Sequence, residues 1–168
     1  MDAQDLVTDI IALARSQGRT LTTAESCTGG LIAGAITRVS GASDVFHEGY
    51  ITYSNEAKSR LLGVPESVLA EHGAVSLKTA HGMAEGALKS ASADLALSVT
   101  GIAGPTGGTE DKPVGTVCFG LAFKSPDGEV KSLANLHHFE DMGRDFIREQ
   151  SVMYALHWAL EHLRAEES

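Results

Sequence analysis

The sequence predicts an α/β protein: a three-layer α/β/α sandwich with a mixed, mostly parallel sheet, in a single domain that spans residues 1–168. Three observations support this fold class. Helical and strand-like segments alternate early in the chain, which is typical of parallel strands joined by helices. Two later strand-like segments are joined by a short turn, which adds an antiparallel pair to the sheet. With 168 residues, 43% of them hydrophobic, the chain is long enough to bury one full core.

Apolar residues at helical spacing, together with capping residues, predict six helices. Leu6 and Ile10 lie on the apolar face of the first helix, and Gly18 is expected to end it. Asn55 is the expected N-cap of a short helix, and Ser76 is that of a longer one. The six helices are expected before residue 18, over 28–39, from 55, over 65–73, from 76, and over 143–163.

Runs of β-branched, aromatic and apolar residues predict five strands. The run from Asp94 to Thr100 is short and apolar, as expected of an interior strand. The turn between the last two strands is indicated by Ser125-Pro126-Asp127-Gly128. The five strands are expected over residues 19–24, 45–53, 94–100, 114–123 and 129–138.

Composition narrows the classes of partner. The net charge of −9 argues against nucleic-acid or anionic-membrane binding, because both need a basic face. No apolar stretch approaches the ~20 residues of a membrane span, and the acidic N-terminus lacks the features of a signal peptide. The two cysteines, Cys27 and Cys118, form no disulfide or zinc pattern. We therefore expect a cytoplasmic protein with reduced thiols.

The segment Ala24-Glu25-Ser26-Cys27-Thr28-Gly29-Gly30 lies where a predicted strand becomes a predicted helix. Free backbone N–H groups at such a corner can hold an anion, or can serve a nucleophile as an oxyanion site. Ser26 has the position of a nucleophile, although serine is also a common N-cap. Cys27 is a second candidate, because a helix N-terminus lowers the pKa of a thiol, and its other interpretation is a small buried hydrophobe.

A serine nucleophile needs a base, and Lys58 is the candidate for it. None of the seven histidines lies in a recognisable triad motif, and no G-x-S-x-G elbow is present. Tyr53 lies at the end of a predicted strand and Lys58 in the first turn of the next helix. The positive end of the helix dipole and partial burial both lower the pKa of a lysine there. The structural alternatives are a solvated lysine and a packed strand tyrosine.

The glycine-rich stretch from Gly101 to Thr109 follows a predicted strand and is typical of an anion-binding loop. Its spacing matches neither a P-loop nor a dinucleotide fingerprint, and a flexible surface loop is the alternative. Arg144 and Arg148, one turn apart on the last predicted helix, could grip a phosphate or lie on a solvated helix face. No Cys/His cluster appears, so we expect no metal and no other cofactor.

Taken together, these motifs resemble the CinA carboxy-terminal family, the nicotinamide-nucleotide amidases. The resemblance covers nearly the whole chain, and five motifs occur in the family's order. They are residues 24–30, Gly49-Tyr50-Ile51-Thr52-Tyr53-Ser54-Asn55-Glu56-Ala57-Lys58, Gly73-Ala74-Val75-Ser76, Thr100-Gly101-Ile102-Ala103-Gly104-Pro105-Thr106-Gly107-Gly108 and Pro113-Val114-Gly115-Thr116-Val117. The resemblance implies hydrolysis of the carboxamide of nicotinamide mononucleotide to nicotinate mononucleotide and ammonia, in the pyridine nucleotide cycle.

The resemblance also implies roles for individual residues. Ser26 would be the nucleophile and Lys58 the base, with Tyr53 positioning or relaying the proton. The amides of Cys27 and Thr28 would donate to the oxyanion, and the Gly104–Gly108 loop with Arg144 would hold the phosphate. The residues with an implied oxyanion or substrate-binding role are Cys27, Thr28, Gly29, Gly30, Thr100, Gly101, Gly104, Pro105, Thr106, Gly107, Gly108 and Arg144.

Other expectations concern the chain's surroundings. Many members of this family carry a larger N-terminal domain that residues 1–168 do not contain, so we expect the function of this unit alone. A homo-oligomer, either a dimer or a trimer, is expected. The alternatives to the deamidase are a non-catalytic nucleotide-binding or regulatory module and an amidase that acts on another carboxamide.

Overall fold

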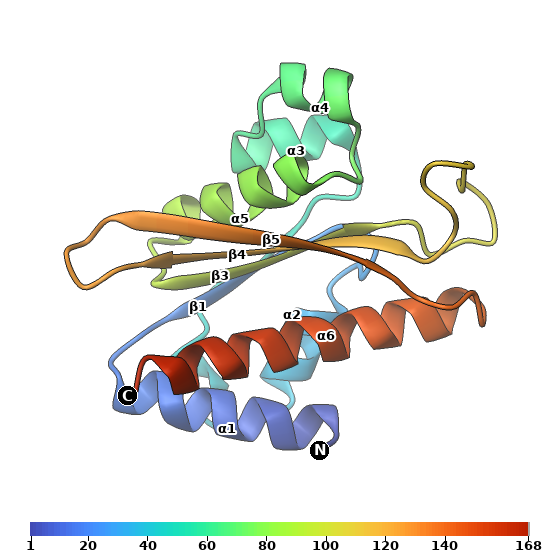
Figure 1. Ribbon diagram of the computed structural model, residues 1–168. Coiled ribbons are helices and arrows are strands. Elements are labelled where there is room, and N and C mark those ends of the chain that lie inside the picture. Colours follow the sequence, from blue (N-terminus) through green and yellow to red (C-terminus); the bar gives the residue numbers. More distant parts are fainter. Residues whose placement is uncertain (168) are drawn as a thin grey trace.

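The computed structural model describes residues 1–167 and shows helices on both faces of one five-stranded sheet (Figure 1). One face is covered by α1 (Ala3–Ser16), α2 (Leu31–Thr37) and α6 (Arg144–Ala165). The other face carries α3 (Asn55–Leu62), α4 (Glu66–His72) and α5 (Leu77–Ala91). The predicted three-layer α/β/α arrangement is therefore confirmed.

The sheet is mixed, as predicted, and divides into two halves. Its strand order is β2-β1-β3-β4-β5. β1 (Leu21–Glu25) pairs in parallel with both β2 (Tyr50–Ile51) and β3 (Leu95–Gly101). β4 (Thr116–Lys124) pairs antiparallel with β3 and with β5 (Val130–His138), which forms the far edge. We call β2-β1-β3 the parallel half and β3-β4-β5 the antiparallel half.

The strand predicted over 45–53 is shorter than expected. Only Tyr50–Ile51 forms a ladder with β1, and Ala42–Asp44 forms a 3₁₀ turn (η1). The carbonyl of Glu48 accepts a hydrogen bond from the Thr22 side chain at 2.9 Å instead of joining a ladder. Phe46 forms an isolated parallel bridge with Leu21, so strand propensity overestimated how much of this segment joins the sheet.

Helix starts follow local capping. Ser54, and not the predicted Asn55, caps α3, since its Oγ accepts from the Ala57 amide at 3.1 Å. Ser76 caps α5 as predicted, by accepting from the Thr79 amide at 3.0 Å.

Two apolar clusters fill the two spaces between sheet and helices. No helix among residues 1–167 is long and apolar enough to cross a membrane.

Candidate active site

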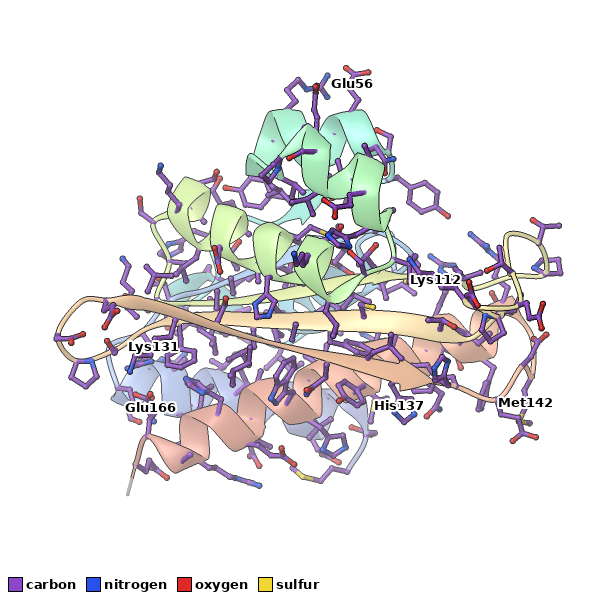
Figure 2. All side chains as sticks on the ribbon, turned by 45° about the horizontal axis from the view of Figure 1, so that its top comes forward. Glu56, Lys112, Lys131, His137, Met142 and Glu166 are labelled. Carbon is purple, nitrogen blue, oxygen red and sulfur yellow. The ribbon has the colours of Figure 1, made fainter. Side chains whose placement is uncertain are left out.

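Polar groups gather at the edge of the sheet where the three parallel strands end. Ser26 follows β1, Thr52 and Tyr53 follow β2, and the glycine-rich loop follows β3. Ligands of α/β proteins bind beyond the carboxyl ends of parallel strands. The glycine-rich loop marks this end of the molecule, at which Figure 2 labels Lys112 and Met142, whereas Lys131 and Glu166 lie at the opposite end.

Ser26 is held in a tight turn between β1 and α2. Its amide donates to the carbonyl of Val99 at 2.9 Å, and its carbonyl accepts from the amide of Gly29 at 3.0 Å. Gly29 and Gly30 have φ values of +55° and +101°, which favour glycine. A Cβ on Gly30 would lie 2.9 Å from Cδ1 of Ile51. The two glycines therefore let the chain reverse close to β2, which leaves Ser26 half-buried at the sheet edge.

The N-terminus of α2 binds a carboxylate of the protein itself, that of Glu25. The buried carboxylate of Glu25 accepts from the amides of Ile32 and Ala33 at 2.8 and 3.1 Å. It also accepts from the hydroxyl of Thr28 at 2.7 Å. The Glu25 carboxylate thus satisfies two amides of the first turn of α2 and places a negative charge at the positive end of the helix dipole. The hypothesis that this helix end holds an external anion is wrong for the Ile32 and Ala33 amides.

Lys58 reaches from α3 to Ser26. Its Nζ lies 3.0 Å from Ser26 Oγ and 2.9 Å from the carbonyl oxygen of Thr52. The side chain is 2% exposed, and no carboxylate among residues 1–167 forms an ion pair with it. Burial lowers the pKa of Lys58 below the usual 10.5, because desolvation disfavours the ammonium form. A neutral amine that donates to Thr52 keeps a lone pair that can accept the Ser26 proton.

Cys27 is not a competing nucleophile. Its side chain is buried, and burial raises the pKa of the Cys27 thiol to about 12. A thiol with this pKa is protonated at neutral pH and is therefore a poor nucleophile. The helix end that was expected to lower it is neutralised by Glu25. The interpretation of Cys27 as a small buried hydrophobe fits its surroundings.

Two backbone amides of the turn are free to donate. Among residues 1–167, no acceptor in another residue takes the N–H group of Cys27 or Thr28. Cys27 and Thr28 are the two residues after Ser26, and backbone N–H groups next to a nucleophile can serve as oxyanion donors.

Tyr53 contacts Arg144 and not the serine–lysine pair. Its side chain is 60% exposed, and its hydroxyl accepts from Arg144 Nη2 at 2.7 Å. Nη1 of the same guanidinium donates to the carbonyl of Gly104 at 2.8 Å. No hydrogen bond among residues 1–167 joins Tyr53 to Ser26 or Lys58. Arg144 therefore links the end of β2 to the base of the glycine-rich loop.

Arg148, one turn further along α6, contacts the Ser26 turn. Nε donates to the carbonyl of Cys27 at 3.0 Å, and Nη2 donates to that of Thr28 at 3.4 Å. Both arginines of the predicted pair thus reach the site edge, but through different groups. Neither lies on a purely solvated helix face.

The glycine-rich loop begins later than predicted. Gly101 belongs to β3, where it pairs with Val117, and a Cβ on it would lie 2.7 Å from Cγ2 of Val117. The hydroxyl of Thr100 donates to the carbonyl of Ala74 at 2.8 Å, so it ties β3 to the segment before α5. Beyond the buried Gly104, residues 105–109 are exposed. The part of the loop that is free to meet a ligand is therefore residues 105–109.

The base of this loop is anchored on both sides. The amide of Ile102 donates to the carbonyl of Thr116 at 2.9 Å, and the amide of Gly115 donates back to Ile102 at 2.8 Å. Lys112 Nζ donates to the carbonyl of His72 at the end of α4, at 2.9 Å. These contacts fix where the exposed tip projects from the sheet edge.

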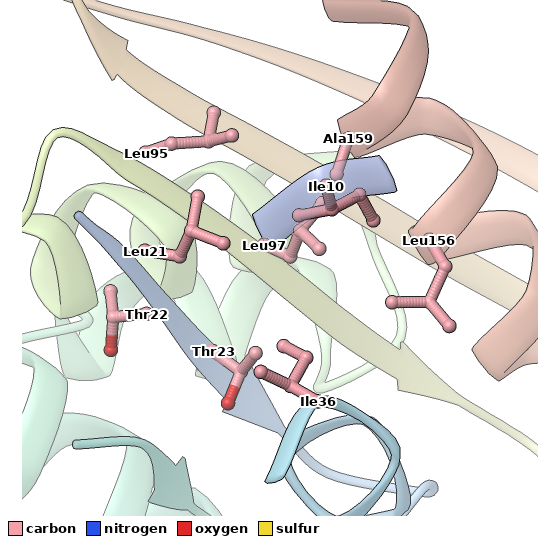
Figure 3. A pocket seen from close by; sticks show the side chains of 9 residues that line it. All are labelled: Ile10, Leu21, Thr22, Thr23, Ile36, Leu95, Leu97, Leu156 and Ala159. Atoms are coloured by element: carbon pink, nitrogen blue, oxygen red, sulfur yellow. The ribbon is translucent and has the colours of Figure 1, made fainter. Parts of the chain in front are cut away.

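An enclosed cavity in the core is not a candidate ligand site. It lies between the sheet and the α1, α2 and α6 layer (Figure 3). Its walls are mostly aliphatic, and its volume is about 10 Å³. That is room for at most a single water molecule. The nine lining residues are Ile10, Leu21, Thr22, Thr23, Ile36, Leu95, Leu97, Leu156 and Ala159.

The fold and site define a class of protein: an α/β domain with a serine hydroxyl and a buried lysine amine at the carboxyl ends of its parallel strands. The sequence model of the CinA C-terminal domain family matches residues 3–163, so the chain belongs to the CinA C-terminal domain family.

Relatives with curated names include a nicotinamide-nucleotide amidohydrolase, PncC, of Escherichia coli K12. It is 51% identical over 142 residues, which are 84% of this chain and 83% of that protein. A putative competence-damage inducible protein of Symbiobacterium thermophilum is 49% identical over 162 residues, or 92% of this chain. The chain spans only 37% of the length of that relative.

Solved structures share the fold over almost the full length. The competence/damage inducible protein CihA of Agrobacterium tumefaciens has a TM-score of 0.89 and 44% sequence identity. The match covers 98% of this chain and 96% of that one.

Sequence reasoning missed two groups at this site. The sequence-based predictions give Glu25 no role, although its place just before a predicted helix is a usable signal for a helix-end anion. The Thr52 carbonyl that accepts from Lys58 has no sequence signal, because every residue carries such a group.

Proposed function

We propose that this chain is an amidohydrolase that converts nicotinamide mononucleotide to nicotinate mononucleotide and ammonia. The contact of 3.0 Å between the buried Lys58 amine and Ser26 Oγ is the observation that carries the proposal. The similarity to the Escherichia coli amidohydrolase supports the substrate. Residues 1–168 would act as a single amidase domain.

In the proposed reaction, Lys58 accepts the proton of Ser26 as Oγ attacks the carboxamide carbon. The N–H groups of Cys27 and Thr28 then stabilise the negative charge on the carboxamide oxygen, and one such donor is typically worth ~3 kcal/mol. The Lys58 ammonium gives its proton to the leaving nitrogen, and ammonia departs. Water, deprotonated by Lys58, hydrolyses the acyl-enzyme and releases the carboxylate product.

The nucleotide phosphate would lie between Arg144 and the exposed loop of Pro105, Thr106, Gly107 and Gly108. Arg144 is supported by its bond to Gly104, which places the guanidinium at the base of this loop. Tyr53 would act by positioning Arg144, because its hydroxyl accepts a hydrogen bond from Arg144 Nη2. A proton relay by Tyr53 stays a prediction. Gly29 and Gly30 would shape the turn, while Thr100 and Gly101 would hold the loop in place.

A non-catalytic nucleotide-binding module remains the competing hypothesis. It gives no reason to bury an unpaired lysine against a serine, since desolvating an amine is costly. Ammonia release from nicotinamide mononucleotide by the wild type and by Ser26→Ala decides between them. We expect release by the wild type and a loss of about 10⁴-fold or more in the variant. Ser132→Ala on β5 is the matched control, expected to be as active as the wild type.

Three outcomes would contradict the proposal in whole or in part. Equal ammonia release by Ser26→Ala would exclude Ser26 as the nucleophile. Binding of the nucleotide by the wild type without release of ammonia would favour the binding module. Release from a different carboxamide alone would keep the amidase and change its substrate.

We also propose a homo-oligomer, a dimer or a trimer, in the cytoplasm. Exposed apolar side chains on β5 (Val130, Leu133 and Leu136) support self-association. The two buried free thiols, Cys27 and Cys118, fit a reducing compartment. Light scattering of the purified protein measures the oligomeric state, and a monomer at all concentrations would contradict it.

A further inference from the structure

We propose that Arg148 is a positioning residue that presets the Thr28 amide as an oxyanion donor. This inference rests on the proposed function, since it concerns the same serine. It assigns to Arg148 the orientation of a peptide group, in place of the phosphate contact that sequence reasoning left open for it.

A planar peptide unit joins Cys27 to Thr28. The carbonyl of Cys27 and the N–H of Thr28 belong to one peptide unit, and in a trans peptide they point in opposite directions. Arg148 Nε donates to this carbonyl at 3.0 Å. The guanidinium therefore holds the carbonyl on its own side of the chain and turns the Thr28 N–H to the other side.

The next peptide unit is held in the same way. Arg148 Nη2 donates to the carbonyl of Thr28 at 3.4 Å, so the Gly29 N–H points away from Arg148, and this N–H donates to the carbonyl of Ser26 at 3.0 Å. One guanidinium thus fixes two successive peptides, and the second closes the turn that carries the nucleophile. The planar fork of arginine suits this task, whereas a lysine amine has no fixed geometry.

Other contacts leave Thr28 only one free backbone group. Its hydroxyl is held by Glu25 at 2.7 Å, and its carbonyl is held by Arg148 and by the Leu31 amide at 2.9 Å. Its N–H has no acceptor in another residue among residues 1–167. At Gly29, a Cβ would lie 3.3 Å from Arg148 Nη2, so glycine also keeps the space for the guanidinium. Thr28 is 0% exposed, so its N–H is a buried donor without an acceptor in another residue among residues 1–167. Its orientation is set before any substrate arrives, as oxyanion stabilisation requires.

The experiment compares three variants. Arg148→Met removes the fork and keeps an apolar stem, and Arg148→Lys keeps the charge without the fork. Arg164→Met, at the other end of α6, is the matched control, because among residues 1–167 the Arg164 side chain pairs with Asp9 alone, away from the Ser26 turn. Thermal unfolding of each variant checks that it is folded.

The first readout is steady-state hydrolysis of nicotinamide mononucleotide. We expect both Arg148 variants to lower kcat by about 10²-fold, the effect of one oxyanion donor, with KM within threefold of the wild type. Arg164→Met should keep both constants. A raised KM with an unchanged kcat would overturn the proposal, since it would place Arg148 on the phosphate.

The second readout needs no nucleotide. A fluorophosphonate probe reacts with an activated serine: the Ser26 Oγ–phosphorus bond forms, fluoride leaves, and Lys58 takes the hydroxyl proton. Charge on the phosphoryl oxygen needs the same donors, so we expect at least tenfold slower labelling in both Arg148 variants and no change in Arg164→Met. Labelling within twofold of the wild type would overturn the positioning role. If the wild type reacts with the probe but not with the nucleotide, the proposed substrate fails while this readout still tests Arg148.

Discussion

The two halves of the sheet treat polar and apolar side chains in opposite ways. The parallel half and its helices bury polar side chains, including Thr23, Glu25 and Lys58. The antiparallel half buries an apolar row on β4 and exposes large apolar side chains on β5. Burying polar groups is costly, whereas an apolar core stabilises the fold. The comparison indicates that the antiparallel half is scaffold and that the parallel half carries the chemistry.

The sharpest test of this division exchanges one lysine in each half for methionine. Lys58→Met removes the proposed base, and general-base catalysis typically contributes 10²–10⁴-fold, so we expect kcat to fall about 10³-fold. Lys131→Met on β5, at the opposite end of the molecule from Lys112, should keep activity within twofold (Figure 2). Ammonia release measures both. Similar losses in the two variants would remove the functional distinction between the halves.

The fold class and the existence of the helices and strands follow from hydrophobic patterning, but the serine–lysine contact does not. Ser26 and Lys58 are 32 positions apart, and their contact depends on β2 lying beside β1 and on Ser54 starting α3. Patterning shows that these elements exist, whereas pairing and helix direction are set by tertiary packing. The resemblance to the CinA carboxy-terminal family, and not hydrophobic patterning, predicts that Ser26 and Lys58 act as a pair.

The roles of buried charges were harder to predict. A helix N-terminus after a glycine pair suggests an anion site, but only the structure shows that Glu25 occupies it. Burial, with a smaller contribution from the Glu25 charge, raises the pKa of the Cys27 thiol, so the expected lowering is wrong. Desolvation depends on the whole surroundings of a side chain, which no local pattern contains.

A second test asks whether the scaffold of the parallel half positions Lys58. Gly86 of α5 lies against the end of α3, and a Cβ there would be 1.8 Å from the carbonyl oxygen of Leu62. Gly86→Ala should therefore push α3 outward, lowering the free energy of unfolding by about 1–3 kcal/mol and reducing kcat as the Lys58–Ser26 contact loosens. Urea unfolding and ammonia release measure the two effects.

The matched control is Gly34→Ala in α2, where an added Cβ has no neighbour within 4 Å. Alanine favours a helix interior over glycine, so this variant should gain about 0.5–1 kcal/mol and keep its activity. If Gly86→Ala proved as stable and as active as Gly34→Ala, the close contact of α5 and α3 would not matter for the site.

The smallest expected effect is a difference in how stability depends on pH. Burial lowers the pKa of Lys58 in the folded protein, whereas the unfolded chain keeps a value near 10.5. Between these two values the unfolded chain holds the Lys58 proton and the folded protein has released it. The free energy of unfolding therefore rises with pH in this window, by at most about 1.4 kcal/mol per unit. Below the lowered pKa the folded protein bears the full cost of a buried ammonium.

Lys58→Met lacks this contribution, whereas Lys131→Met retains it. The stability of Lys58→Met relative to the wild type should thus be greatest at low pH and decline as the pH approaches 10.5. The buried thiols of Cys27 and Cys118, with pKa values raised from 9.0 to about 12 and about 11, make the free energy of unfolding fall as the pH rises above about 9. All three proteins keep both thiols, so the Lys58 contribution is the difference between the curves of the wild type and Lys58→Met. Urea unfolding between pH 7 and 10 gives the curves for all three proteins. Parallel curves for the wild type and Lys58→Met would mean that the amine is charged when buried, and a charged amine could not accept the proton of Ser26.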